Sequence, residues 1–313
     1  MIDTFQICDN LELFSQIESD SIDLIYIDPP YNTGRNSGDF VDKFENMKTF
    51  RDSFLKPRLQ ECHRVLKKTG NIVVHVEPKI SHHVRILLDE IFGDKMFANE
   101  IVWTTGGNAK TKKNMNRNHD TLIWYKVSNN STFNPIYKEY DENYKKSSGV
   151  KVCEFTGKEY VTTAIHNSQP DVNPRFNLRY EWNGFHRQWY VSKEKMIYLH
   201  ENNRLHYNKR GIPRIKRYLE EMDGIPVRDI WDDISNTQKD EKLDYATQKP
   251  VKLLERIVKM FSNEEETVMD IFAGSGTLGR AAINLNRHYI LSDINPKAKE
   301  VFLSSINNQK EDR

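Results

Sequence analysis

The feature that most limits the fold is an alternation of short apolar runs and amphipathic stretches at both ends of the 313-residue chain. Near the N-terminus one apolar run stops at Asp28-Pro29-Pro30, because proline cannot donate to a strand ladder. Strand and helix patterns that alternate in this way predict a mostly parallel sheet with helices on its faces. The expected strands are residues 5–7, 21–27, 72–76, 267–271 and 288–292, and the expected helices are 10–17, 47–67, 81–92, 250–261 and 277–285.

The middle of the chain lacks this regular pattern. From about Gly106 it becomes polar and rich in Asn, Tyr and Lys, with one further strand expected at 121–127. Between residues 104 and 217 there are 21 Lys and Arg against 10 Asp and Glu, a local excess of 11 positive charges in a chain of net charge +1. We therefore expect an α/β domain formed by residues 1–105 and 241–313, and a basic module at 106–240 that meets a polyanion.

Composition narrows the class of protein. Hydrophobic residues make up 37% and charged residues 29%, which is typical of a globular chain rather than a disordered one. No apolar run is long enough for a membrane span, and the N-terminus lacks the pattern of a secretory signal. The three cysteines are far apart, and the histidines, His75 among them, show no metal-ligand spacing. We expect a cytoplasmic protein without disulfides or a metal site.

One motif lies near the C-terminus, where Asp270-Ile271-Phe272-Ala273-Gly274-Ser275-Gly276-Thr277 joins an expected strand to an expected helix. Glycines let a ligand approach the backbone, and a helix start offers free N–H groups. Asp293 ends the next strand, where an acidic side chain can accept hydrogen bonds from ribose hydroxyls. Because Gly274, Gly276 and Gly279 also satisfy GxGxxG, a dinucleotide enzyme and a plain tight turn both stay open.

The second motif, Asp28-Pro29-Pro30-Tyr31, lies at the carboxyl end of a strand, where open α/β sheets bind ligands. An exocyclic amino group is a weak nucleophile, because its nitrogen lone pair is delocalised into the ring. The Asp28 carboxylate and the Pro29 carbonyl could accept its two hydrogens and localise that lone pair. Tyr31 offers a ring on which an extruded base can stack. An ordinary strand-ending turn is the alternative interpretation of such a tetrad.

Together the two motifs resemble the amino-methyltransferases of DNA restriction–modification systems. The order of the parts is similar to the permuted β class, with the catalytic tetrad first and the methyl-donor motif last. Type III modification subunits share much of this pattern, but we expect this chain to be too short for one. Cys8, Leu278 and Ser292 depart from the family pattern, outside the tetrad. The similar segments are residues 8–13, 27–34, 39–44, 64–70, 229–234, 247–254 and 270–277.

The resemblance implies a Rossmann-like sheet that binds S-adenosylmethionine, with an inserted target-recognition module. The tetrad Asp28, Pro29, Pro30 and Tyr31 would be catalytic. Phe272 would pack on the adenosine, Thr247 and Lys249 would approach the methionine carboxylate, and Asp293 would bind the ribose. Asp9 and Asn10 would meet the adenine ring. The whole implied cofactor set is Asp9, Asn10, Thr247, Lys249, Asp270, Phe272, Gly274, Ser275, Gly276, Thr277 and Asp293.

The resemblance also implies double-stranded DNA as the substrate, with the methylated base flipped out of the helix. It leaves open a cognate restriction endonuclease and a homodimer as partners. The basic module carries cations in a Gly/Asn loop and in a later segment, which suit phosphate contacts. The candidate DNA-binding residues are Lys110, Lys112, Lys113, Arg117, Arg210 and Arg214.

Adenine N6 is the favoured target, because the tetrad begins with Asp. Cytosine N4 stays open, since the same pair of acceptors serves either amino group. An NAD-dependent dehydrogenase would leave the tetrad and the basic middle unexplained. Enzymes that methylate protein or RNA amides usually have Asn at the position of Asp28, and a catalytically inactive DNA-binding module would not need an intact tetrad.

Overall fold

A computed structural model describes residues 2–31, 35–36, 41–106, 115–169, 172, 174–238 and 241–311, with backbone alone at 35–36, 41 and 308–311. The chain divides into two compact units. Unit 1 comprises Met1–Ile136 and Arg228–Arg313, and unit 2 comprises Tyr137–Val227.

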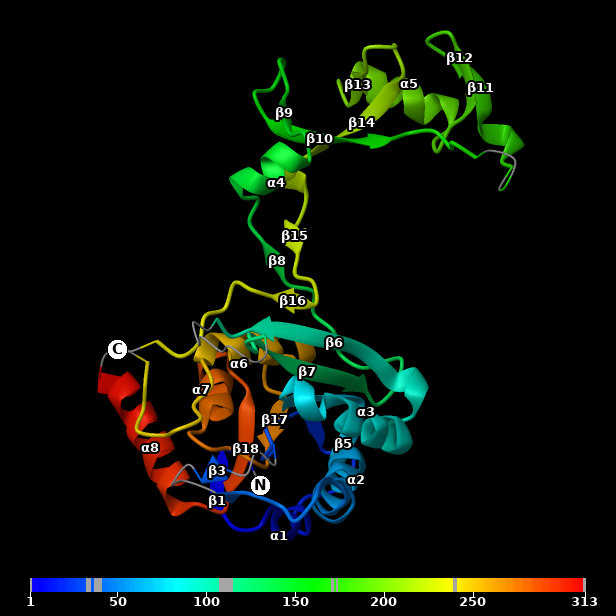
Figure 1. The fold of residues 1–313 in the computed structure, drawn as a ribbon. Helices are drawn as coiled ribbons and strands as arrows, with labels where there is room; N and C mark the ends of the chain where they lie inside the picture. The colour runs from blue at the N-terminus through cyan, green and yellow to red at the C-terminus, as the bar shows by residue number, and fades with distance from the viewer. Residues whose placement is uncertain are drawn as a thin grey trace. The chain divides into compact units, whose positions relative to one another are not determined.

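Unit 1 is built on an eight-stranded sheet in the order β1-β18-β17-β2-β5-β7-β6-β16 (Figure 1). The first five strands in that order run parallel to their neighbours, whereas β7 is antiparallel to both β5 and β6. The strands span Thr4–Ile7 (β1), Ile22–Ile27 (β2), Leu66–Val76 (β5), Phe97–Thr104 (β6), His119–Lys126 (β7), Ile230–Trp231 (β16), Thr267–Asp270 (β17) and His288–Asp293 (β18), and a separate pair spans Arg35–Asn36 (β3) and Val41–Asp42 (β4).

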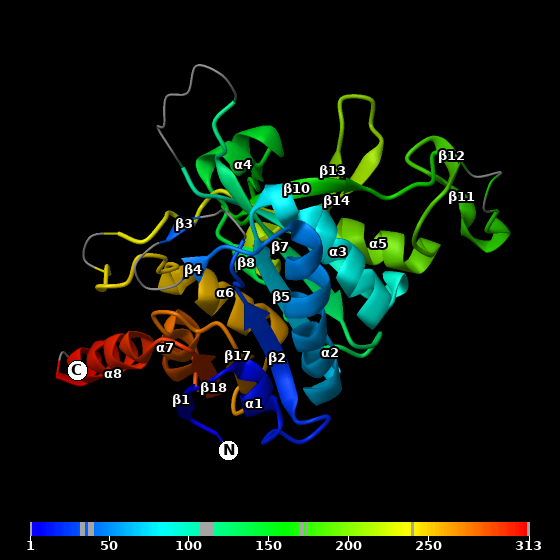
Figure 2. The same ribbon diagram turned by 60° about the horizontal axis from the view of Figure 1, so that its bottom comes forward.

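Helices cover both faces of this sheet, which explains why β2 is buried at every position. Ile25, Met269 and Ile290 lie on one face and pack with the buried residues of the helices between β1 and β6. The other face meets the C-terminal helices, as the turned view also shows (Figure 2). The helices span Asn10–Phe14 (α1), Lys56–Val65 (α2), Pro78–Phe92 (α3), Val251–Phe261 (α6), Thr277–Asn284 (α7) and Pro296–Glu311 (α8), with a 3₁₀ turn at Asp94–Met96 (η2).

Most expected elements form within a few residues of their predicted limits. The helix expected at 47–67 instead divides into a π-helix at Thr49–Leu55 (η1) and α2, and β5 begins at Leu66. Pro57 near the start of α2 has no N–H to donate, so the regular helical ladder is interrupted there. The strand β6 and the helix α8 were not predicted from the sequence.

The structure confirms the mostly parallel sheet and corrects the limits of the predicted module. The sheet is mixed, because β7 inserts antiparallel between β5 and β6. The strand expected at 121–127 therefore belongs to unit 1, where it is buried, and not to a module at 106–240. β16 also joins unit 1 by pairing with β6, so unit 2 is confined to 137–227.

Unit 2 consists of short antiparallel strands with two α-helices. Its largest sheet has the order β13-β14-β10-β9, and a cluster around Trp189 and Met196 forms its main core. In the part of the chain that the structure describes, no helix is long and apolar enough to cross a membrane. The elements are β8 (Tyr137–Lys138), α4 (Glu142–Ser147), β9 (Lys151–Val152), β10 (Glu159–Ala164), η3 (Phe176–Leu178), β11 (Arg179–Trp182), β12 (Phe185–Gln188), α5 (Lys193–Glu201), β13 (Leu205–Tyr207), β14 (Pro213–Tyr218), η4 (Leu219–Glu221) and β15 (Ile225–Pro226).

Candidate active site

Three aspartates mark one edge of the sheet in unit 1. Asp28 directly follows β2, Asp270 is the last residue of β17 and Asp293 is the last residue of β18. The three strands are parallel neighbours, so their carboxyl ends meet at the same edge. The two motifs, which lie far apart in the sequence, are thus brought together by strand order.

The Asp28 carboxylate is held by two side chains. The Tyr31 hydroxyl donates to its Oδ1 and the Lys249 ammonium donates to its Oδ2. The Asp28 and Lys249 side chains are only 18% and 16% exposed, so this ion pair is sheltered from water. The Lys249 Nζ also lies 5.9 Å from the centre of the Tyr31 ring. Burial, and then the Asp28 charge, raise the pKa of Tyr31 well above its ordinary value, so Tyr31 stays a neutral donor.

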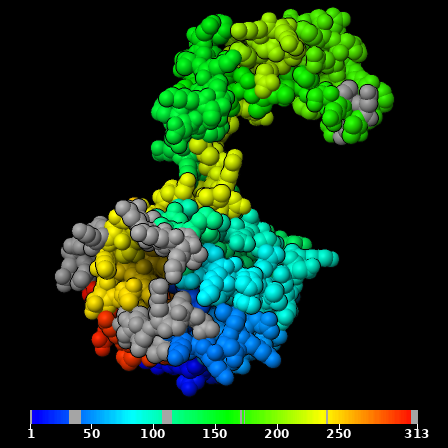
Figure 3. Space-filling model, in the orientation of Figure 1, coloured from blue at the N-terminus to red at the C-terminus, as the bar shows by residue number. Residues whose placement is uncertain are grey.

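The contact between Lys249 and Asp28 was not expected from the sequence, which assigned Lys249 to a cofactor carboxylate. Lys249 lies just before α6, and its carbonyl oxygen accepts from the Thr277 hydroxyl at 3.2 Å. The segment before α6 reaches the surface of unit 1, in yellow in Figure 3. Thr247 in this segment is exposed. The glycine motif therefore orients Lys249 through the backbone, and Lys249 in turn orients Asp28.

The glycine turn after β17 takes left-handed backbone conformations at Gly274 (φ 51°) and Gly276 (φ 73°). A Cβ on Gly276 would lie 2.4 Å from Cδ2 of Phe302 in α8, so this glycine is required by packing as well as by φ. The Gly274 N–H donates to Asp293 Oδ2 at 2.8 Å. Ser275 and Thr277 share a hydrogen bond of 3.0 Å and are buried.

Burial raises the pKa of Asp270 well above its ordinary value, and the charges of Asp28 and Asp293 raise it further. Burial also raises the pKa of Asp293, although backbone N–H donors oppose the shift. A positive charge placed at this edge would oppose both shifts and stabilise the ionised forms of the two carboxyl groups. The arrangement favours a ligand that carries positive charge.

The first residues of α1 lie against the same motif. Asp9 caps α1 by accepting from the Leu11 N–H at 2.8 Å, and it pairs with Arg58 at 2.9 Å. The Asn10 amide donates to the Ile271 carbonyl at 3.0 Å. Asn10 Oδ1 is buried and has no hydrogen-bond partner among the described residues. Of the two predicted contacts to an adenine ring, Asn10 retains a free acceptor, whereas Asp9 is engaged with Arg58.

The predicted aromatic contact, Phe272, is partly buried at this end of unit 1. Its ring lies 5.9 Å from the ring of Phe54, which in turn lies under the guanidinium of Arg58. Tyr245 covers the turn from the other side, since a Cβ on Gly274 would lie 3.2 Å from its ring. Sequence reasoning missed Arg58 and Tyr245, because no local pattern links either of them to the motif.

A buried polar network next to Asp28 was also missed. The Tyr26 hydroxyl lies 2.8 Å from Nδ1 of His75, and Nε2 of His75 lies 3.2 Å from Asp120. Burial, and then the charge of Lys249, lower the pKa of His75, so its ring stays neutral. Polar residues inside otherwise apolar strands were the available signal. The network joins the three strands β2, β5 and β7 by side-chain contacts.

The predicted DNA contacts that the structure describes are divided between the two units. Lys110, Lys112 and Lys113 lie outside the described residues. Arg117, in unit 1, pairs with Glu77 and lies 3.8 Å from Asp120. Arg210 and Arg214 belong to unit 2, where Arg214 donates to the Thr162 hydroxyl at 2.9 Å and Arg210 lies in an exposed turn. Within the described residues, no cluster of His, Cys, Asp or Glu could hold a metal ion.

Comparison with known proteins identifies relatives of this chain. A family model described as DNA methylase, covering the N6 and N4 enzymes, matches residues 22–304. The chain is 26% identical to the type III restriction-modification enzyme StyLTI Mod subunit of Salmonella typhimurium, over 89% of this chain and 49% of that protein. It therefore spans about half the length of that relative.

Two further relatives have lengths closer to that of this chain. It is 26% identical to the DNA adenine methyltransferase YhdJ of Escherichia coli, over 92% of this chain and 76% of that protein. It shares its fold with a DNA modification methylase of Thermus thermophilus, solved with S-adenosyl-L-methionine, at a TM-score of 0.52 and 17% identity over 95% and 90% of the two chains. The family model spans most of the sequence and both motifs, so the chain belongs to the N6/N4 DNA methylase family.

Proposed function

We propose that this chain transfers a methyl group from S-adenosylmethionine to N6 of adenine in duplex DNA, as a β-class enzyme of a restriction–modification system. The observation that carries the proposal is the meeting of the Asp28 tetrad with the glycine turn at one sheet edge. The sheltered ion pair between Asp28 and Lys249 links the two motifs directly.

The residues at this edge fit the cofactor. A sulfonium is a cation, and a positive charge beside Asp270 and Asp293 would favour their ionised forms, which burial opposes. The left-handed turn at Gly274 bears no Cβ that would block an approaching ligand. Asn10 Oδ1 is a buried acceptor with no donor among the described residues, so a ligand could donate to it. When bound, S-adenosylmethionine supplies a methyl group on a positively charged sulfur, and the chain has to present a nucleophile to it.

The tetrad presents that nucleophile. A carboxylate oxygen of Asp28 accepts one hydrogen of the target amino group, and the Pro29 carbonyl accepts the other. For this, the Tyr31 hydroxyl or the Lys249 ammonium gives up its bond to Asp28. Tyr31 then offers its ring to the extruded base. Bound S-adenosylmethionine would supply the methyl group in exchange for one proton of the amino nitrogen, and the Asp28 carboxylate would be the base that accepts this proton.

Two observations bear on the choice between adenine and cytosine as the target base. The tetrad begins with Asp, and one relative is a DNA adenine methyltransferase, which both favour adenine. Cytosine N4 is the second candidate, because the family holds enzymes of both kinds and the acceptor pair suits both amino groups.

Nucleoside analysis tests the proposal. Plasmid DNA from a methylation-deficient host is incubated with the protein and S-adenosylmethionine carrying a labelled methyl group, then digested to nucleosides. We expect label in N6-methyladenine. Label in N4-methylcytosine would overturn the base assignment alone, and unlabelled DNA with intact cofactor binding would overturn the proposed function.

A further inference from the structure

One face of the four-stranded sheet of unit 2 is covered by the main core, and on the other face Tyr160, Lys216 and Tyr218 are buried while Lys151 is exposed. Directly opposed residues of antiparallel strands point to the same side. Leu205, Tyr207 and Ile215 point to one side and pack in the core around Trp189. The pairings place a basic and aromatic set on the other side: Lys151, Tyr160, Thr162, His206, Arg214, Lys216 and Tyr218. We call this side the basic face.

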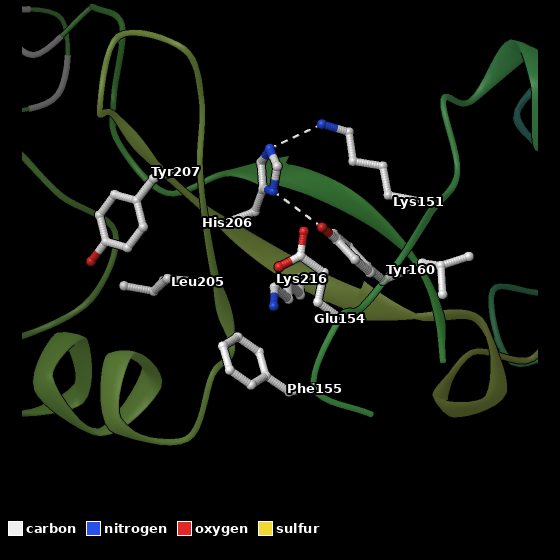
Figure 4. Close-up of a pocket in the computed structure, with 9 residues that line it drawn as sticks. Lys151, Glu154, Phe155, Tyr160, Leu205, His206, Tyr207 and Lys216 are labelled. Atoms are coloured by element: carbon white, nitrogen blue, oxygen red, sulfur yellow. Dashed lines mark hydrogen bonds between the residues drawn. The ribbon is translucent and has the colours of Figure 1, made fainter. Parts of the chain in front are cut away.

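A pocket of about 300 Å³ opens at the basic face (Figure 4). Figure 4 shows His206 between Lys151 and Tyr160, with the Lys151 ammonium 2.9 Å from Nε2 and the Tyr160 hydroxyl 3.1 Å from Nδ1. Because lysine can only donate, this contact requires His206 Nε2 to be an unprotonated acceptor. Two basic groups thus lie in contact without an acid between them.

Further cationic side chains lie close to Lys151 and His206. Lys216 is only 6% exposed, and its ammonium lies 5.1 Å from the centre of the Tyr160 ring and 3.4 Å from Cys153 Sγ. Burial lowers the pKa of His206, and the charges of Lys151, Lys216 and Arg214 lower it further. Glu154 is the one carboxylate among the described residues that line the pocket. Cys153 Sγ accepts from Lys216, whereas Lys151 has no carboxylate partner among the described residues, so an added anion would balance the charge of Lys151.

An exposed aromatic side chain completes the pocket. Phe155 lines the pocket and is 73% exposed, which is unusual for a ring of its size. Cations beside an uncovered ring form the combination that holds a phosphate and stacks the adjoining sugar or base. Peptide carboxylates would need no such ring, so the combination favours a nucleotide phosphate.

We infer that the basic face of unit 2 binds a backbone phosphate of DNA at Lys151 and His206, with the neighbouring nucleoside against Phe155. The inference rests on the proposed function, because it names where the substrate is held outside the catalytic edge. The bound phosphate takes the place of His206 as the acceptor for Lys151, and protonated His206 then donates to it.

The test uses the full chain with Lys151→Gln and His206→Gln, and Lys193→Gln as the control. Lys193 is an exposed cation at the start of α5, so its variant loses the same charge as Lys151→Gln. Binding to a labelled duplex is measured against salt concentration. Lys151→Gln is expected to lower the salt slope by about one and to weaken binding to all sequences alike. Lys193→Gln is expected to match the unaltered protein.

A second readout follows the His206 ring by NMR. Duplex DNA is expected to raise the pKa of His206, because a phosphate then balances the neighbouring cations. Inorganic phosphate and a mononucleotide are separate arms. A rise with duplex alone places the site on DNA, whereas a rise with inorganic phosphate alone overturns the DNA assignment.

The outcomes separate this inference from the proposed function. If both variants bind duplex as Lys193→Gln does and the His206 pKa stays constant, the basic face does not bind DNA, whatever the outcome for methyl transfer. If DNA gains no label while duplex still raises the His206 pKa, the proposed function fails and the basic face stands.

Discussion

The two units place their polar residues in opposite ways. In unit 1 the central strand β2 is buried along its length, and the candidate catalytic residues lie only where β2, β17 and β18 end. In unit 2 the strands are short, and cations lie on one face of the sheet along β9 and β14. A site at strand ends depends on every residue in it, whereas charges spread over a face act almost independently. Substitutions should therefore have abrupt effects in unit 1 and graded effects in unit 2.

The largest expected effect is the loss of methyl transfer in Asp28→Ala. The variant removes the acceptor for the target amino group, so single-turnover transfer should fall by on the order of 10²–10³, while cofactor and DNA binding stay largely intact. Asp223→Ala, which removes an exposed carboxylate of unit 2, is the control and should transfer at the normal rate. Near-normal transfer by Asp28→Ala would show that the catalytic assignment is wrong.

Substitutions of two glycines with left-handed backbones compare how tightly the two units are packed around them. Gly276→Ala places a methyl group 2.4 Å from Phe302, so it should lower the free energy of unfolding by about 3 kcal/mol. Gly184 in unit 2 has φ 80° and open space around it, so Gly184→Ala should cost about 1 kcal/mol from backbone strain alone. Urea unfolding measures both. Equal losses would mean that the contact between α7 and α8 is not tightly packed.

Lys249 tests whether the cofactor half of the site also acts on the catalytic half. Because its ammonium donates to Asp28, Lys249→Met should lower the saturated single-turnover rate by roughly tenfold, besides any weakening of cofactor binding. Asp293→Ala should weaken cofactor binding alone. A Lys249 variant with a normal saturated rate would return this lysine to the purely cofactor-binding role that the sequence suggested.

The smallest expected effect is a difference in pH dependence between two cysteines. Hydrogen bonds from Thr156 and Tyr218 lower the pKa of Cys153 in unit 2 to about 6 from its ordinary 9.0. Its thiolate therefore stabilises the fold above pH 9, and that contribution is lost as the pH falls toward 6. Burial raises the pKa of Cys62 in unit 1, so Cys62→Ser should change stability equally at every pH below 9. Thermal unfolding of Cys153→Ser and Cys62→Ser from pH 6 to pH 9 measures the difference. Parallel curves of stability against pH for the two variants would contradict the assignment for Cys153.

Local chemistry explains what could be predicted from the sequence. Proline ends β2 and left-handed glycines shape the turn after β17 whatever surrounds them, so the two motifs and most strands of the α/β region were located correctly. The mostly parallel sheet was predicted correctly, but the antiparallel direction of β7 was not, because its apolar pattern is the same whether its neighbours run parallel or antiparallel. The limits of unit 2 were missed for the same reason, since only pairing assigns β7 and β16 to the sheet of unit 1.

The sequence by itself determined which residues could do chemistry: a carboxylate before two prolines, and a glycine turn after a strand. The tertiary structure decided which of them meet. Strand order places Asp28 beside Asp270 across 242 positions of sequence, and the hydrogen bond from the Thr277 hydroxyl to the Lys249 carbonyl directs the Lys249 ammonium to Asp28. Contacts of this length depend on the packing of the whole sheet, and no local pattern encodes them.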